Sequence, residues 1–388
     1  MQHRRAELTA RAALRVGVLA AAVALAVVPP GIAADTPPEP DPHLVAAQRA
    51  LAALPLADRA AQVIMTSVPG TTLSSADRRT LTALRPGGVI LFAGNYRSRA
   101  QLARLTASIQ AAVRGAGGAR PSALVSVDQE GGVVKRLRDA PPTRSHPQLG
   151  ALDDVDVTRE EGRRTGVVLR RAGVHLDLAP VADLDLRPHR VMRERSFGSA
   201  PALVSRHVVA FVEGLRAGGA SSSVKHFPGF GAANVNSDDA LATITRTRRQ
   251  LDQDLGPFRA AVAAGAETIM VSHARYTALD RRRPASTSPA AYRLLRDELG
   301  YGGIAITDSL HAAGFAAAAG VGAVPGCERV IAAGADIALL TGRVSEAVAC
   351  RARLVDAVRR GRIPRTRLDE AAVRVLRLKS RLGLLDAR

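Results

Sequence analysis

The chain has 388 residues, of which 47% are hydrophobic, so it can bury the core of one large domain or of two ordinary ones. A formal net charge of +19 would suit a nucleic-acid-binding protein, but aromatic residues make up only 3% of the chain and the arginines are scattered along it. The composition therefore argues against nucleic acid as a partner and favours anionic cell-wall polymers.

The first 34 residues have the layout of a secretory signal peptide. Four arginines precede an apolar run at 16–28, and the small residues of "GIAAD" follow a turn-forming "PPG". The run is short for a membrane span, and no later segment reaches the length that a bilayer needs, although a retained N-terminal anchor stays open. We therefore expect a secreted, extracytoplasmic protein. The proline-rich residues 35–43 are interpreted as a linker to a folded domain over 44–388.

From residue 44 onward, short apolar runs alternate with Ala-, Leu- and Arg-rich stretches that have helical spacing. The runs are "QVIMTSV" (62–68), "GGVILFAG" (87–94), "ALVSVDQ" (123–129), "HLDLAPVAD" (175–183), "SSVKHF" (222–227), "ETIMVSHA" (267–274), "GIAITDS" (303–309) and "DIALLTG" (336–342). Eight strands that alternate with helices predict an α/β fold, a single-domain (β/α)8 TIM barrel. An open doubly wound sheet is the alternative.

Polar residues stand at or just after the ends of several runs. They are Asp128, Asp183, Lys225, His226, His273 and Asp308. In a barrel the carboxyl ends of all strands meet at one face, where active sites are built. Carboxylates and basic groups without metal-ligand spacing or a phosphate-binding glycine loop indicate sugar or carbonyl chemistry.

Five longer motifs contain these residues. They are "VDQEGGVVKRL" (127–137), "RERSFG" (193–198), "KHFPGFG" (225–231), "IMVSHARYTALD" (269–280) and "IAITDSL" (304–310). Their sequence and order resemble glycoside hydrolase family 3, in particular its single-domain β-N-acetylglucosaminidases (β-N-acetylhexosaminidases). The resemblance covers nearly all of the chain after the linker.

The resemblance implies a role for each matching residue. Asp308, in the "TDSL" motif, is expected to attack the anomeric carbon and form a covalent glycosyl-enzyme. The residues expected to bind the sugar are Asp128, Arg136, Arg195, Lys225 and His226. His273 is a further candidate for sugar binding, with a buried core histidine as the open alternative.

The loop after the fifth run departs from the family pattern. Where the resemblance implies "KHFPGHG" and then Asp-Ser-His or Asp-Thr-His, this chain has Phe230 for the first His, Asn236 for the Asp and Asp238 for the catalytic His. The His-Asp pair that serves as general acid/base is absent. Asp238 is the replacement we expect, because a nearby carboxylate such as Asp308 raises the pKa of a second one. Asp239 is the neighbouring candidate.

Several alternatives stay open from the sequence. A sugar-binding relative that has lost catalysis, a glycosidase of another specificity, a phosphorylase and a Schiff-base enzyme built on Lys225 compete with a secreted retaining glycosidase of N-acetylglucosamine-containing cell-wall or chitin-type saccharides. No cofactor or metal is expected, since His175 and Asp177 lack a third ligand. Cys327 and Cys350 are either a disulfide or two buried thiols.

Overall fold

The computed structural model describes residues 41–115, 120–186 and 188–385. The expected signal peptide and most of the expected linker lie outside the described residues. The first described helix, α1 (Pro42–Ala52), begins within the stretch interpreted as linker. Asp41 caps it by accepting a hydrogen bond from the His43 N–H at 2.9 Å.

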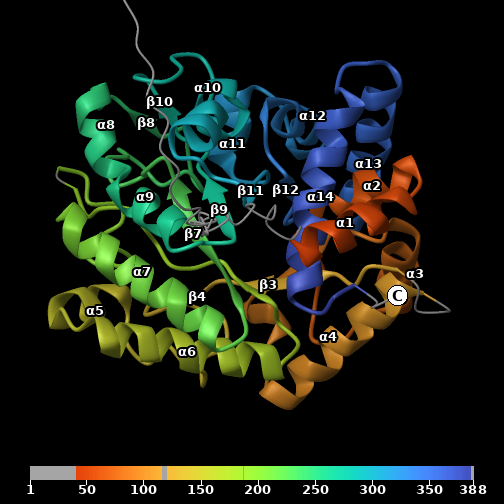
Figure 1. The fold of residues 1–388 in the computed structure, drawn as a ribbon, viewed down its shortest axis with the longest axis horizontal. Helices are drawn as coiled ribbons and strands as arrows, with labels where there is room; N and C mark the ends of the chain where they lie inside the picture. Colours follow the sequence, from red (N-terminus) through yellow and green to blue (C-terminus); the bar gives the residue numbers. More distant parts are fainter. Residues whose placement is uncertain (1–40, 116–119, 187, 386–388) are drawn as a thin grey trace, which may run out of the picture. The chain divides into compact units, whose positions relative to one another are not determined.

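Eight parallel strands close into a barrel, which confirms the predicted fold class (Figure 1). Each strand lies within one of the eight apolar runs, except that β7 begins one residue before its run. The strands are β1 (Ile64–Ser67), β2 (Gly88–Leu91), β3 (Leu124–Val127), β6 (Leu176–Asp177), β7 (Ser221–Phe227), β9 (Thr268–Val271), β11 (Ile304–Ser309) and β12 (Ile337–Leu339). The barrel is closed by β1 and β12, with Ile64 opposite Ala338 and Met65 opposite Leu339.

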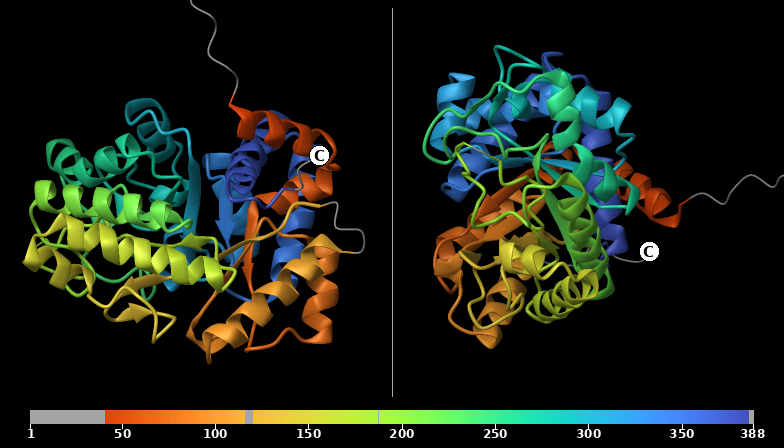
Figure 2. Two further views of the ribbon diagram at one scale, coloured as in Figure 1. Left: turned by 60° about the horizontal axis from the view of Figure 1, so that its bottom comes forward. Right: turned by 90° about the vertical axis from the view of Figure 1, so that its left-hand side faces the viewer.

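Helices surround this barrel (Figure 2). After α1 they are α2 (Leu56–Gln62), α3 (Ser75–Leu84), α4 (Arg99–Arg114), α5 (His146–Leu152), α6 (Val155–Arg171), α7 (Pro201–Ala217), α8 (Arg248–Asp254), α9 (Gly256–Ala263), α10 (Pro289–Arg293), α11 (Ala313–Ala319), α12 (Ala323–Ala333), α13 (Val344–Arg359) and α14 (Arg365–Arg381). Short helical turns are η1 (Ala93–Asn95), η2 (Ala285–Thr287) and the π-helical η3 (Leu294–Glu298).

Two small sheets lie outside the barrel. β4 (Gln129–Gly131) and β5 (Val134–Lys135) form an antiparallel hairpin directly after β3. β8 (Thr243–Ile244) and β10 (Arg275–Tyr276) pair in parallel. The sequence interpretation included neither of them, because two- and three-residue strands leave no periodic pattern.

The core has two layers, as the alternation of side chains along a strand requires. One layer fills the barrel interior with residues such as Met65, Met270 and Ile306, and Val375 and Leu378 of α14 belong to the same cluster. The second, larger layer lies between the outer strand faces and the helices. The interior is therefore packed with side chains, and the space for a site lies at the barrel's end.

Helices α6 and α7 pack side by side through glycines. A Cβ on Gly214 would lie 2.1 Å from the Arg159 carbonyl oxygen, and one on Gly162 would lie 2.7 Å from the Phe211 carbonyl oxygen. Such distances fall inside van der Waals contact with the facing backbone. Glycine is therefore required at these positions for the two helices to approach so closely.

Cys327 of α12 and Cys350 of α13 form a disulfide, with Cα atoms 6.0 Å apart. Of the two alternatives that the sequence left open, the structure has the disulfide.

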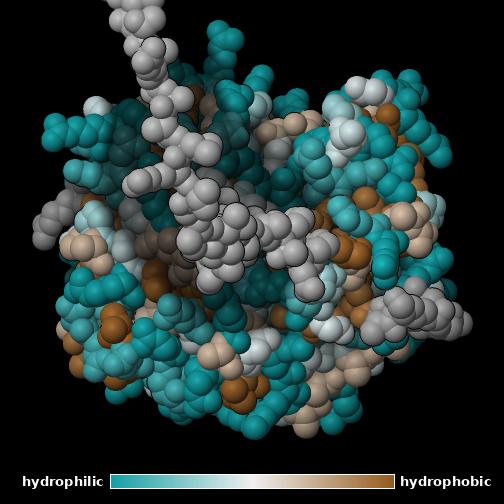
Figure 3. Space-filling model, in the orientation of Figure 1, coloured by the Kyte–Doolittle hydropathy of each residue, from teal (hydrophilic) through white to brown (hydrophobic). Residues whose placement is uncertain are grey.

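On the face shown in Figure 3, hydrophilic residues cover most of the visible surface of the described residues. Among the described residues no single helix is long and apolar enough to cross a membrane; α11 and α12, which meet at a bend of 66°, have enough length and apolar character only when taken together.

Candidate active site

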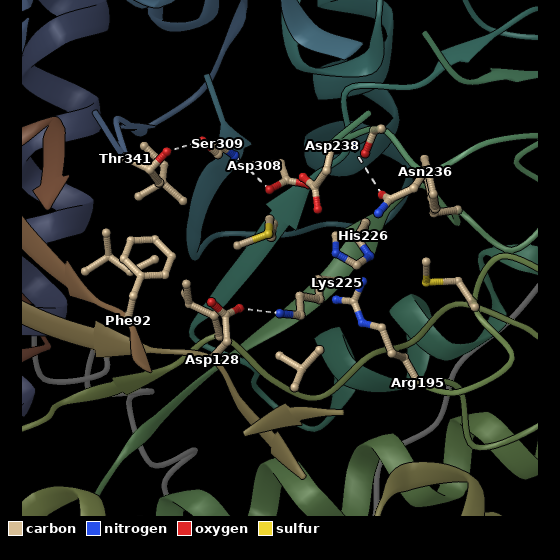
Figure 4. A pocket seen from close by; sticks show the side chains of 18 of the residues that line it. Phe92, Asp128, Arg195, Lys225, His226, Asn236, Asp238, Asp308, Ser309 and Thr341 are labelled. Atoms are coloured by element: carbon tan, nitrogen blue, oxygen red, sulfur yellow. Dashed lines mark hydrogen bonds and ion pairs between the residues drawn. The ribbon is translucent and has the colours of Figure 1, made fainter. Parts of the chain in front are cut away.

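A pocket lies at the carboxyl ends of the barrel strands and encloses about 720 Å³, including the part open to solvent. Seven of the eight residues predicted for the site line it: Asp128, Arg136, Arg195, Lys225, His226, Asp238 and Asp308. They come from strand ends and loops that are far apart in the sequence, and the barrel brings them together (Figure 4).

Asp308 and Asp238 present their carboxyl groups on the same side of the pocket (Figure 4). Asp308 belongs to β11, and the Ser309 N–H donates a hydrogen bond to it at 2.7 Å. Asp238 belongs to the loop between β7 and β8. This loop is tied to the start of α11, because the Ala313 N–H donates to the Asp238 carbonyl oxygen at 3.1 Å.

The electrostatic surroundings separate the pKa values of these two carboxyl groups. Burial opposes ionisation of Asp308, but His226 and the Ser309 N–H hold its pKa below the ordinary value. Partial desolvation by the pocket wall and the charge of Asp308 raise the pKa of Asp238, although its side chain keeps contact with solvent. Asp308 is therefore the group that ionises first, and Asp238 is the group that keeps a proton more readily.

Lys225 lies between two carboxylates on the floor of the pocket. Its Nζ is 2.6 Å from Asp128 Oδ1 and 2.7 Å from Glu130 Oε1. Burial disfavours the charged form of Lys225, but Asp128 and Glu130 raise its pKa above the ordinary value. The lysine is therefore a fixed ammonium group, which argues against the Schiff-base alternative, since that chemistry needs a neutral amine.

Glu130 is the residue that organises these cations, and the sequence analysis did not identify it. It is buried, and Arg195 donates two hydrogen bonds to it, at 2.9 Å from Nε and 2.7 Å from Nη2. Arg136 takes a looser position, with Nη2 3.5 Å from Asp128 Oδ2. The predicted sugar-binding residues thus form an alternating array of carboxylates and cations.

His226 is oriented by Asp183, a fully buried carboxylate that stands at the end of the fourth run in the sequence. Asp183 accepts from His226 Nδ1 at 2.6 Å, and its Oδ1 accepts from the Phe230 N–H at 2.6 Å. With Nδ1 held in this way, the other ring nitrogen of His226 is available to the pocket. Phe230 lines the pocket beside this ring, where the resemblance implies a histidine.

His273 does not line the pocket. Of the two roles that the sequence left open for it, the structure has the buried core histidine and not the sugar contact. Burial lowers its pKa, so the ring is neutral. Its Nε2 lies 2.9 Å from the Ser309 carbonyl oxygen, and its Nδ1 lies 2.8 Å from Ser286 Oγ. Because a carbonyl only accepts, Nε2 carries the proton. His273 therefore positions the backbone next to Asp308.

Asp177 is a buried carboxyl group close to the array. Its Oδ1 accepts from the Gln129 N–H at 2.9 Å, and its Oδ2 has no hydrogen-bond partner. Burial raises its pKa well above the ordinary value, which favours the protonated form of this carboxyl group. His175, two residues earlier, accepts instead from the Val125 N–H at 3.2 Å. Across the residues that the structure describes, no three His, Cys, Asp or Glu side chains are placed to hold a metal ion.

The site thus combines two neighbouring carboxyl groups with a cationic array, at the carboxyl ends of the strands of a closed (β/α)8 barrel. This combination is typical of a barrel enzyme that carries out acid/base and nucleophilic chemistry on a polar substrate. Residues 56–378 match the glycosyl hydrolase family 3 N terminal domain. The chain belongs to glycosyl hydrolase family 3, as its motifs had indicated.

The chain is similar to proteins named as hexosaminidases or acetylglucosaminidases. A beta-hexosaminidase from Nitrosomonas eutropha is 38% identical over 260 residues, which are 64% of this chain and 72% of that protein. A family 3 beta-N-acetylglucosaminidase structure from Paenibacillus has a TM-score of 0.81 and 34% identity, covering 86% of this chain but only 63% of the Paenibacillus chain. A beta-N-acetylhexosaminidase structure from Beutenbergia cavernae has a TM-score of 0.76 and 31% identity, covering 84% of this chain and 99% of that one.

Proposed function

We propose that the protein is a retaining glycoside hydrolase that releases terminal β-linked N-acetylglucosamine from cell-wall or chitin-type saccharides outside the cytoplasm. The observation that carries the proposal is the pair Asp308 and Asp238, whose pKa values are shifted in opposite directions within one pocket. When the surroundings of two carboxyl groups shift their pKa values apart in this way, the group with the lower pKa is suited to act as base or nucleophile and the group with the higher pKa as acid. The substrate class is taken from the names of the similar proteins.

In the first step Asp308 attacks the anomeric carbon, and Asp238 gives its proton to the leaving glycosidic oxygen. The carbon–oxygen bond breaks as the bond to Asp308 forms. In the second step Asp238 takes a proton from water, whose oxygen attacks the same carbon and releases Asp308. Two inversions give net retention, and both carboxyl groups return to their starting states.

The array of charged residues would hold the sugar during both steps. Cations at Lys225 and Arg195 are anchored by buried carboxylates, so they can donate to hydroxyl groups without moving. Asp128, which contacts Lys225 and also lines the pocket, can accept hydrogen bonds from hydroxyl groups. Orientation of the ring against Asp308 supplies a large share of the rate advantage of such enzymes.

The test is hydrolysis of two substrates by purified protein. With 4-nitrophenyl N-acetyl-β-glucosaminide the leaving group needs little protonation, whereas with N,N′-diacetylchitobiose it needs a proton. Asp308→Asn should abolish both activities. Asp238→Asn should cost about 10²–10⁴-fold on the disaccharide and less on the nitrophenyl substrate. Asp239, the neighbouring candidate acid, is exposed and is not among the residues that line the pocket, so Asp239→Asn is the matched control and should retain activity.

Azide provides a second readout. In Asp238→Ala, azide should accelerate turnover and give a β-glycosyl azide, because it replaces the water that Asp238 activates. Equal slow rates for wild type and Asp308→Asn on both substrates would contradict the proposal. A wild-type rate that depends on added phosphate would instead assign a phosphorylase.

One observation favours a second candidate, a sugar-binding protein without turnover. Phe230 and Asp238 occupy positions where the resemblance implies histidines, while the binding array is complete. Calorimetric binding of N-acetylglucosamine, unaffected by Asp308→Asn and with no product after long incubation, would support this candidate over the hydrolase.

A further inference from the structure

A second cleft lies on the other side of the β4–β5 hairpin and encloses about 760 Å³, including open solvent. Its lining is mostly basic and small apolar residues: Arg99, Lys135, Arg138, Asp139, Ala140, Pro141, Thr143, Arg163, Arg164, Val167 and Val168. Neither the proposed mechanism nor the binding array uses any of them. The volume is within the range of pockets that hold small ligands or segments of polymers.

One short segment separates this cleft from the catalytic pocket. Val134 and Arg136 line the catalytic pocket, whereas Lys135 and Arg138 line the second cleft. Val134 and Lys135 form the strand β5, in which neighbouring side chains point to opposite sides, whereas Arg138 reaches the second cleft from the turn that follows the strand. The residues that follow Gly131 therefore supply side chains to two cavities at once.

A further part of the cleft lining is one face of α6. Arg163 and Arg164 stand one helical turn before Val167 and Val168, so the four residues share this face. The other face of α6 is packed against α7 through its glycines and cannot turn away. This part of the cleft is therefore rigid, and its apolar side chains lie one helical turn beyond its basic side chains.

The positive charges in the cleft are only partly compensated. Arg99 pairs with Asp139 at 3.2 Å, and Arg163 donates twice to Glu160, each time at 2.7 Å. Within the described part of the chain, Lys135, Arg138 and Arg164 have no ion pair and no side-chain hydrogen bond. Three unpaired cations around one concavity repel one another, and an anionic ligand would relieve that repulsion.

We propose that this cleft is a binding site for an anionic glycan, a polysaccharide that carries carboxylate or phosphate groups, separate from the catalytic pocket. Cations from two separate segments, the one around β5 and α6, can contact successive anionic groups of such a chain, and the small apolar residues can contact the sugar rings. No aromatic side chain lines the cleft, so it lacks the stacking platform that single-stranded nucleic acid binds. The site would hold the protein on an acidic polymer.

The test compares two triple variants with the same change in net charge. Lys135→Gln/Arg138→Gln/Arg164→Gln removes the unpaired cations of the cleft. Arg281→Gln/Arg282→Gln/Arg283→Gln removes three exposed arginines from another loop. Binding is measured by fluorescence anisotropy with labelled polygalacturonate for carboxylate, poly(glycerol phosphate) for phosphate, neutral chitin oligosaccharide and a single-stranded oligonucleotide. Circular dichroism melting verifies that both variants fold.

We expect the cleft variant to bind at least one of the acidic glycans about tenfold more weakly, with less than about a twofold effect in the loop variant. The two acidic probes distinguish a carboxylate from a phosphate ligand. Equal weakening in both variants would show attraction by net charge only and would overturn the proposal, as would stronger binding of the oligonucleotide than of either glycan. Since no turnover is measured, the result is independent of whether the pocket hydrolyses sugars.

Discussion

Glu130→Gln is the substitution that most directly tests how the binding array is held together. Glu130 is 1% exposed and contacts two cations, Arg195 through two hydrogen bonds and Lys225 at 2.7 Å. Glutamine has nearly the same shape, so the change removes the charge without leaving a cavity. It also turns one acceptor into an NH₂ donor, which faces a cation.

The expected loss of stability follows from these contacts. A hydrogen bond to a charged group contributes about 1.5–3 kcal/mol, and two are lost or weakened, so the sum is roughly 3–6 kcal/mol. Breaking a buried ion pair by removing one partner costs about 3–5 kcal/mol, in agreement with that sum. Lys225 keeps Asp128, whereas the Arg195 side chain loses its two hydrogen bonds, so we expect the lower half of the range.

The pH dependence has a definite sign. Burial alone would raise the pKa of Glu130, but Lys225 and Arg195 hold it well below its ordinary value of 4.5. A depressed pKa contributes stability that is fully present above the unfolded-state value and is lost as the pH falls below it. The difference between wild type and Glu130→Gln should therefore be largest at pH 6–7 and should shrink below about pH 4.5.

Urea unfolding followed by circular dichroism at pH 7 and pH 4 measures both effects. Glu160→Gln is the matched control, because Arg163 makes the same two-hydrogen-bond contact to Glu160 on the exposed side of α6. Solvent screens that pair, so its removal should leave the urea midpoint nearly unchanged. A loss below about 1 kcal/mol for Glu130→Gln, or one that does not vary with pH, would refute the reasoning.

Three other changes have expected outcomes. Gly214→Ala would place a Cβ 2.1 Å from the Arg159 carbonyl oxygen, so it should destabilise the protein by roughly 1–3 kcal/mol or more although alanine favours helix; Gly302→Ala, with no atom within 4 Å, should not. Asp177→Asn should stabilise the protein at pH 7, because burial raises the pKa of Asp177 well above its ordinary value of 3.8. The gain should vanish near pH 3, where the carboxyl group is protonated in both the folded and the unfolded state. Unfolding measured over a series of pH values, with Asp280→Asn as control, tests this. Replacing both Cys327 and Cys350 by alanine opens a loop of sequence separation 23 and should cost about 3 kcal/mol, visible as a loss of thermal stability that reducing agent reproduces in wild type only.

The barrel could be predicted from the sequence because each strand is a separate apolar run bounded by turn residues. "GGVILFAG" and "ETIMVSHA" became β2 and β9 without any knowledge of their neighbours. Polar residues at other strand ends, such as Asp128 and Asp308, were found in the same way, since strand ends meet at one face of a barrel. Local pattern and global fold agree in these segments, so local reasoning was sufficient.

The partners of the site residues could not be predicted, because each pair joins segments that are distant in sequence. Arg195 meets Glu130 across 65 positions, and His226 meets Asp183 across 43. Glu130, in "QEGG", has the sequence context of an ordinary turn residue, and its burial appears only when the hairpin folds over the barrel. His273 shows the reverse: it stands at a strand end, yet Ser286 and Ser309 hold it inside the core.

Closure of the barrel by β1 and β12 makes the first strand of the domain dependent on the last. Until β12 arrives, β1 presents an unpaired edge of backbone N–H and C=O groups, and β11 presents another. Joining such distant strands is slow, because chain entropy must be lost before the contacts form. A nascent or truncated chain that stops before residue 336 therefore exposes two unpaired strand edges, which can pair with other chains and cause aggregation.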